Sequence, residues 1–181
     1  ALEEALVAAR KYTMAIYGGL PDSFWVPAEF PYLQIVNPPL WELAHIAWFA
    51  EYFCLRWRNE AGEECPPCLL ERGDELFDSA RVAHPSRWTN DYPTRERILW
   101  YLDESLHSVQ QALRTSGPSQ RYFFRLALAH EIMHGEALVM TLVTLDQPVP
   151  ECVASRQALS GTRRLLAHEG GFRPAGLRLS G

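Results

Sequence analysis

Long segments in which apolar residues recur with a helical period take up most of this chain of 181 residues. Residues three or four positions apart lie on the same face of an α-helix, so this pattern predicts amphipathic helices. It appears in four segments, at about residues 2–17, 38–58, 94–115 and 121–145. Four long helices that follow one another along a chain predict an all-α fold, in which they pack as a four-helix bundle.

Residues at the ends of these segments indicate where the helices begin and stop. The two glycines at residues 18–19 end the first segment, because glycine is favoured just after a helix. Asn37 is a good N-cap, and Pro38 suits the first helical position because its φ angle is fixed. Glu42 then lies near the positive end of this second helix, and Thr94 opens the third.

Outside the helices, the sequence predicts a long loop and a tail of different character. The segment from residue 59 to residue 92 is polar and rich in Gly and Pro, and it is too long for a simple connection, so we expect a functional loop. Residues 151–181 have no sustained helical period, and residues 170–176 have the composition of a turn and a strand. We therefore expect a bundle domain at residues 1–150 and a separate segment at residues 151–181.

The bulk composition argues against two kinds of partner. The formal net charge of −5 does not suit nucleic acid, since phosphate binding needs clustered Lys and Arg. No uninterrupted apolar run reaches the roughly 20 residues that a membrane span needs, and no signal peptide is visible at Ala1. We expect no membrane partner and a cytoplasmic location.

The cysteines do not resemble a disulfide framework, which is rare in a chain of this length. Cys65-Pro-Pro-Cys68 has the spacing of a redox motif or of half a zinc site. No second pair completes a zinc site, and no strand followed by a helix surrounds the motif as in redox proteins. Reduced thiols are the preferred interpretation.

Three histidines carry the clearest chemical signal. His130 and His134 are four residues apart on the last predicted helix, so their rings project from one face about 40° apart. That spacing lets two imidazoles bind one metal ion. His45 lies among apolar residues of the second predicted helix and can supply a third nitrogen from across the bundle. The set predicts a three-histidine metal site with open positions, suited to Zn(II), Fe(II) or Ni(II).

Helical geometry places the nearby carboxylates away from this site. Glu136 points about 140° from the line that bisects the two histidines, so we do not expect it to be a ligand. Glu131 points about 80° away, which suits either a contact with one of the metal-binding histidines or a position that faces solvent. Ala127 and Ala137 lie about 40° to either side of the bisector, and their small side chains leave room beside an ion.

The remaining polar and aromatic residues give weaker signals. Solvent-exposed positions are expected for the other histidines, His84, His107 and His168. Four arginines near the long loop can hold a substrate carboxylate or simply be solvated: Arg81, Arg87, Arg95 and Arg97. An aromatic cluster on the second helix is interpreted as core more than pocket: Trp41, Trp48, Phe49, Tyr52 and Phe53.

Two motifs resemble a known family. The segment Asn37-Pro-Pro-Leu-Trp-Glu-Leu-Ala-His45, followed far downstream by His130-Glu-Ile-Met-His134-Gly-Glu136, resembles the DinB-like N-terminal domain of the ergothioneine sulfoxide synthases and the related selenoneine synthases. The resemblance covers roughly residues 1–150 and rests on an HxxxHxE motif combined with one upstream histidine.

The resemblance implies a non-haem Fe(II) held by His45, His130 and His134. It implies that dioxygen is used to join a sulfur or selenium donor to the imidazole C2 of hercynine, the donor being γ-glutamylcysteine, cysteine or a selenosugar. Arg87 matches a region in which relatives hold the donor carboxylates. In relatives the catalytic tyrosine comes from a C-terminal domain of the formylglycine-generating type, and Gly170-Gly-Phe172 is similar to the opening strand of that domain.

One position departs from the family pattern. Sulfoxide synthases commonly have Gln immediately before the second motif histidine, where it helps to position the imidazole substrate, and this chain has Met133. Methionine cannot replace the hydrogen bonds of Gln, which favours a divergent branch such as selenoneine synthase. A stand-alone zinc- or nickel-dependent thiol transferase and a bundle with a purely structural metal remain open as alternatives.

Overall fold

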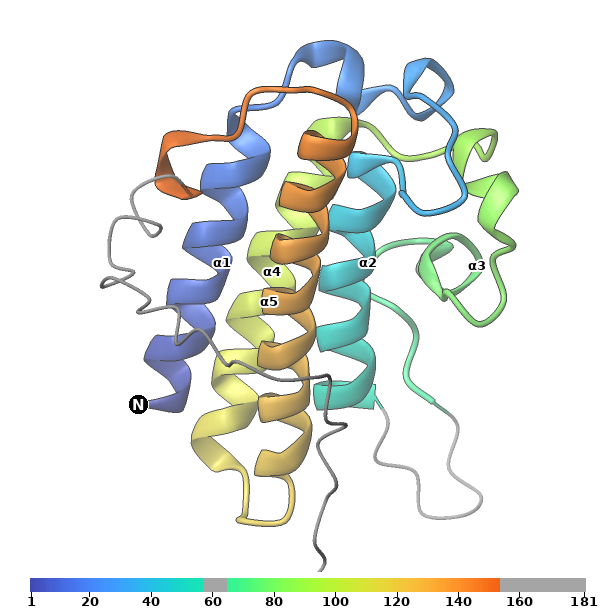
Figure 1. The fold of residues 1–181 in the computed structure, drawn as a ribbon. Helices are drawn as coiled ribbons and strands as arrows, with labels where there is room; N and C mark the ends of the chain where they lie inside the picture. Colours follow the sequence, from blue (N-terminus) through green and yellow to red (C-terminus); the bar gives the residue numbers. More distant parts are fainter. Residues whose placement is uncertain (57–64, 154–181) are drawn as a thin grey trace, which may run out of the picture.

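The computed structural model describes residues 1–56 and 65–153, and within these ranges the chain is helical and has no β-strand (Figure 1). The long helices are α1 (Leu2–Gly18), α2 (Pro39–Glu51), α4 (Arg95–Thr115) and α5 (Arg121–Thr144). Shorter elements are η1 (Asp22–Trp25), η2 (Pro27–Glu29), the π-helical η3 (Tyr52–Arg56), α3 (Gly73–Phe77) and η4 (His84–Trp88). The predicted all-α bundle is confirmed.

The order of the helices explains why one connection is long. In Figure 1, α1 and α5 run in one direction and α2 and α4 in the other, while α2 packs against both α4 and α5. Because α2 and α4 are parallel neighbours, the chain between them must return along the length of the bundle. The segment that includes α3 and η4 makes this crossover, so its length has a topological cause as well as any functional one.

The start of α2 differs from the prediction. Pro38 is the N-cap residue with φ −59° and ψ 131°, Pro39 is the first helical residue, and no side chain caps the helix. The predicted cap at Asn37 is wrong, because a residue that precedes proline is forced out of the helical region, and Pro38 precedes Pro39. The Asn37 side chain instead accepts a hydrogen bond from Arg87 Nη1 at 2.7 Å.

The end of α2 also departs from a simple helix. The helix ends at Glu51 and continues as the π-helical turn η3, whereas the prediction had it run to about Arg58, which lies outside the described residues. A π-turn rotates the residues that follow it relative to a regular helix. Here Arg56 turns toward Asp74 of α3, and a two-bond ion pair joins them.

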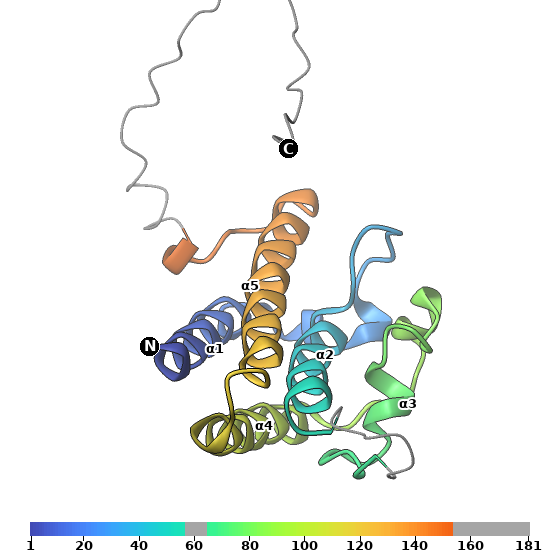
Figure 2. The same cartoon turned by 90° about the horizontal axis from the view of Figure 1, so that it is seen from below.

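Helix α2 lies at the centre of the molecule. Its side chains are buried on almost every face, and Trp41, Leu43 and Ala44 have no exposed surface. Figure 2 shows the reason, since α4, α5 and α3 surround it. A helix buried on all sides gives its polar residues no access to bulk water, so each must find a partner inside the protein.

Helix α5 is joined to α1 and α4 by a buried ion pair. Arg10 of α1 donates from Nε to Glu131 Oε1 at 2.7 Å and from Nη1 to the carbonyl of Leu102 on α4. Both side chains are almost completely buried. The prediction that Glu131 contacts a ligand or solvent is therefore wrong: no local sequence signal links it to a partner 121 positions away.

Helix α5 is long and apolar enough to cross a membrane, by length and composition alone. The search for uninterrupted apolar runs did not identify it, because polar residues interrupt its apolar residues. In the bundle, 39% of its most apolar window is buried. Core helices of bundles commonly pass the same test, so this property is weak evidence. Most of the predicted segment 151–181, including the predicted turn and strand at 170–176, lies outside the described residues.

Candidate metal centre

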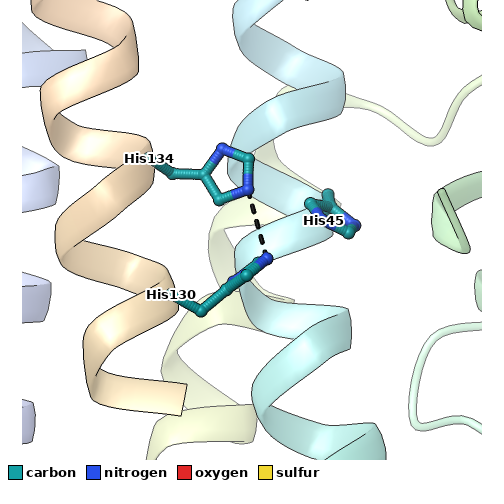
Figure 3. A group of neighbouring side chains, drawn as sticks. All are labelled: His45, His130 and His134. Atoms are coloured by element: carbon teal, nitrogen blue, oxygen red, sulfur yellow. Dashed lines mark hydrogen bonds between the residues drawn. The ribbon is translucent and has the colours of Figure 1, made fainter. Parts of the chain in front are cut away.

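The three predicted histidines meet between α2 and α5 (Figure 3). His45 projects from α2, while His130 and His134 project from successive turns of α5. One ring nitrogen of each lies within 4.8 Å of those of the other two. We call these three residues the histidine cluster. Because α2 and α5 are packed neighbours, the cluster rests on two rigid elements of the bundle and not on loops.

Two members of the cluster have their outward-facing nitrogen occupied. His45 Nδ1 lies 2.8 Å from the Phe77 carbonyl, which can only accept, so this nitrogen is the donor. His134 Nδ1 lies 2.8 Å from Glu42 Oε1, which as a carboxylate is likewise an acceptor. In its neutral form, each of these rings therefore carries its proton on Nδ1 and keeps a lone pair on Nε2. This is the arrangement in which imidazoles bind metal ions.

His130 completes the cluster with a different environment. Its Nε2 lies 3.2 Å from Nε2 of His134, the contact drawn as a dashed line in Figure 3. Its Nδ1 is buried and has no hydrogen-bond partner among the described residues. Phe49 stacks on its ring, with centroids 3.5 Å apart and planes inclined by 7°. The stacking of Phe49 and the contact with His134 together set the orientation of this third ring.

The spacing of these nitrogens fits a metal ion. With metal–nitrogen bonds of about 2.0–2.1 Å and ligand angles of about 90–109°, two adjacent ligand nitrogens lie about 2.9–3.4 Å apart. The 3.2 Å between His130 and His134 falls in this range. The wider limit of 4.8 Å for the whole set needs only a small movement of a ring. Three imidazole nitrogens suit Zn(II), Fe(II) or Ni(II), so the donors fit a metal without choosing it.

Two histidines of the cluster, His45 and His130, are held in the neutral form that binds metals. Burial, followed by the nearby His134 and Arg87, lowers the pKa of His45 to about 3. Burial and the two neighbouring histidines lower the pKa of His130 to about 2. Both rings are therefore neutral near pH 7, and a metal ion has no proton to displace from either of them.

Part of the predicted aromatic core packs directly against the cluster. Trp41 stacks on His45 with ring centroids 4.8 Å apart, and Trp48 stacks on it at 5.9 Å. Both tryptophans are buried, while Phe49 is half-buried. The interpretation as core is right for the two tryptophans but incomplete for Phe49, which shields His130.

Arg87 reaches the site through Trp41. Its guanidinium lies 3.8 Å from the centre of the Trp41 ring, and Nη1 and Nη2 donate to Asn37 Oδ1 and the Val82 carbonyl. Its Nε is buried without a partner among the described residues, and burial lowers its pKa. The structure thus puts the positive charge of Arg87 close to His45, but most of its donors are engaged within the protein.

Met133 and Glu136 lie outside the cluster. Met133 is 50% exposed, on the side of α5 that turns away from the interior. Glu136 is exposed and makes no contact with the histidines, in agreement with the helical geometry. The two other described histidines, His84 and His107, were both predicted to face solvent. His107 is exposed and lies 2.7 Å from Gln111, whereas His84 is half-buried and lies 2.7 Å from the Val36 carbonyl. The prediction that His84 is solvated is wrong.

The other arginines and the cysteine pair have local partners. Arg81 and Arg95 form ion pairs with Asp78 and Asp22, and Arg97 lies over the Trp100 ring. Cys65 is exposed, and Cys68 donates a hydrogen bond to Glu51 at 3.3 Å. His168 lies outside the described residues.

Sequence reasoning missed Glu42, which takes part in a chain of contacts from α1 to α5. Glu42 is 2% exposed, and Tyr17 Oη donates to its Oε2 at 3.4 Å while His134 uses Oε1. Burial of Tyr17 raises its pKa, and the negative charge of Glu42 raises it further. A carboxylate within an otherwise apolar helix, three residues before His45, was the available signal.

The class that the fold and the site define is a helical bundle with a candidate three-histidine metal site between two of its helices. The family model of the DinB superfamily matches residues 5–138, which cover α2, α4 and most of α1 and α5. The chain belongs to the DinB superfamily. No curated protein shows a significant match to it.

Proposed function

We propose that the histidine cluster holds Fe(II) and that the chain is the metal-binding part of an O2-dependent enzyme. The proposed reaction joins a sulfur or selenium donor to the imidazole C2 of hercynine. The observation that carries the metal site is the convergence of two Nε2 lone pairs, of His45 and His134, on the position that His130 also faces. Lone pairs aimed at one another repel unless a cation or a proton lies between them.

The choice of iron and of hercynine is supported by the sequence resemblance. Iron in a three-histidine site has vacant coordination positions, at which dioxygen and a chalcogen donor can bind. The match to the DinB superfamily agrees with this proposal, but the superfamily includes more than the synthases that the proposal names. Met133 in place of the usual Gln favours the selenium branch within the proposal.

The protein residues have distinct parts in this scheme. Glu42 and the Phe77 carbonyl fix the tautomers of His134 and His45, and Phe49 fixes the plane of His130. Trp41 and Phe49 exclude water from one side of the cluster, where aromatic faces also suit the trimethylammonium group of hercynine. Arg87 is the proposed contact for a donor carboxylate through its remaining Nε–H.

A second candidate is a zinc- or nickel-dependent thiol transferase, with a purely structural metal as the non-enzymatic form. The observation in its favour is that three neutral imidazoles fit Zn(II) as well as Fe(II). In this case the metal activates a thiolate and no dioxygen is consumed. A structural site would have four protein ligands, and the cluster within the described residues has three.

Anaerobic reconstitution with Fe(II) tests the proposal, followed by oxygen uptake with hercynine and each candidate donor. Both this chain and any longer polypeptide that contains it should be used. His130→Ala should lose stoichiometric metal, and His107→Ala, which alters an exposed histidine of α4, should keep it. Full occupancy in His130→Ala would contradict the site. Metal-loaded protein that transfers thiols without consuming oxygen would favour the second candidate.

A further inference from the structure

The outward side of α5 is mainly apolar from residue 122 to residue 143. Eight residues, spaced three or four apart except for the adjacent pair Ile132 and Met133, are all exposed and lie within about 60° of one line along the helix. We call them the outer face of α5: Tyr122, Arg125, Ala129, Ile132, Met133, Glu136, Met140 and Val143. The large apolar members are 46–70% exposed. A face about 32 Å long with this composition is unusual on a protein that stays alone in solution.

Among the residues that the structure describes, no other helix covers this face. In Figure 2, α1 and α2 lie on the two sides of the first half of α5 and α4 lies below it in the picture, while the C-terminal half of α5 extends away from them. A groove of about 630 Å³ runs alongside, between α1 and α5, with Ile132 and Glu136 in its wall. The face thus offers both an exposed ridge and a hollow beside it into which large side chains can fit.

The two charged residues of the face indicate what covers it. Arg125 and Glu136 have opposite charge, and neither forms an ion pair with another described residue. Two copies of α5 can pack antiparallel about a twofold axis that passes near residues 130 and 131. Residue numbers then rise along one helix as they fall along the other, so the numbers of two facing residues add up to about 261. Arg125 then faces Glu136 of the second copy, at two symmetry-related places. We infer that the outer face of α5 binds the same face of a second copy of this chain.

The apolar residues agree with the same register. Tyr122 lies opposite Met140 of the second copy, and Ala129 lies opposite Ile132 and Met133, near the axis. A small residue at the crossing point lets two helices approach closely, while large residues on both sides fill the remaining space. A lipid surface is the less suitable occupant, because Arg125 and Glu136 lie in the middle of the face and would be desolvated without partners.

Charge substitutions test both the dimer and its register by sedimentation velocity, over a protein concentration range of about 1 µM to 1 mM. The unmodified chain should form dimers. Arg125→Glu or Glu136→Arg alone places like charges opposite each other twice and should raise the dimer dissociation constant about tenfold or more. The double variant should dimerise like the unmodified chain. Lys11→Glu, an exposed charge change on α1, should have no effect.

Mixing the two single variants gives the sharpest result. In the mixed dimer the acidic residues of one chain face the basic residues of the other, so the mixture should form heterodimers more tightly than either variant dimerises alone. An unmodified chain that is monomeric throughout the range would overturn the inference. So would dimers that Arg125→Glu leaves intact, or single variants that fail to combine. Metal content serves as a check on folding, because none of these residues belongs to the histidine cluster.

Discussion

Replacing Glu42 by Gln should weaken metal binding without removing any proposed ligand. Glu42 is buried and accepts the Nδ1–H of His134 at 2.8 Å, which holds Nε2 of that ring toward the other two histidines. Gln has nearly the same shape, and its amide oxygen can still accept from Nδ1. The substitution therefore removes the charge of the acceptor and little else.

The size of the effect follows from the change in hydrogen-bond type. A bond to a charged acceptor contributes about 1.5–3 kcal/mol and a neutral one about 0.5–1.5 kcal/mol, a difference of roughly 1–1.5 kcal/mol. That corresponds to about a tenfold loss of metal affinity for Glu42→Gln. Glu42→Ala removes the acceptor altogether and should approach the hundredfold loss that is typical of deleting such a partner.

The assay is a competition between the protein and a chelator for Zn(II) or Co(II), with thermal unfolding of the metal-free variants measured alongside. Glu136→Gln is the matched control, because this exposed carboxylate is two residues from His134 and contacts none of the cluster. Metal affinity of Glu42→Gln equal to that of the unmodified chain would refute the positioning role. An equal loss in Glu136→Gln would show that general charge, and not orientation of His134, causes the effect.

Three further predictions concern the fold. Gly73→Ala should destabilise the protein by about 1–3 kcal/mol in urea denaturation, because a Cβ there would lie 2.3 Å from Cys68 Sγ; Gly18→Ala, with open space around it, is the control. Burial raises the pKa of Cys68 to about 11, so its contribution to stability is complete below its ordinary value of 9.0 and is lost as the pH rises toward 11. Cys68→Ala should flatten this alkaline decline, and an unchanged slope would refute it. Arg10→Met should cost about 3–5 kcal/mol by leaving Glu131 unpaired, and adding Glu131→Leu should recover much of that loss.

The sequence was most informative wherever the signal was local. Helical periodicity predicted the four long helices to within a few residues, apart from the end of α2, because each amphipathic pattern is complete within its own segment. The pair His130 and His134 was visible as a shared helical face for the same reason. The start of α2 was predicted one residue too early, although the reason is also local. Pro39 keeps Pro38 out of the helical conformation, because a proline restricts the backbone of the residue before it.

Contacts between distant segments were beyond such reasoning. Glu42 lies 92 positions from His134, and its place near the start of α2 gave a sufficient local explanation for an acidic residue. The Phe77 carbonyl that orients His45 belongs to the backbone, so no side chain marks it. The three candidate ligands could thus be identified from sequence, whereas the groups that orient them could not, because their identity depends on how α2, α3 and α5 pack.

The charges around the histidine cluster bear on which donor the proposed site would accept. Three imidazoles are neutral ligands, so a divalent ion that they hold keeps both positive charges. The buried carboxylate of Glu42, bound to His134, offsets part of that charge, while Arg87 adds a positive charge close enough to lower the pKa of His45. In a buried site such an excess interacts more strongly than it would in water. An anionic co-ligand is therefore favoured over a neutral one. A thiolate or selenolate meets this requirement, and a donor carboxylate directed at Arg87 would add to it.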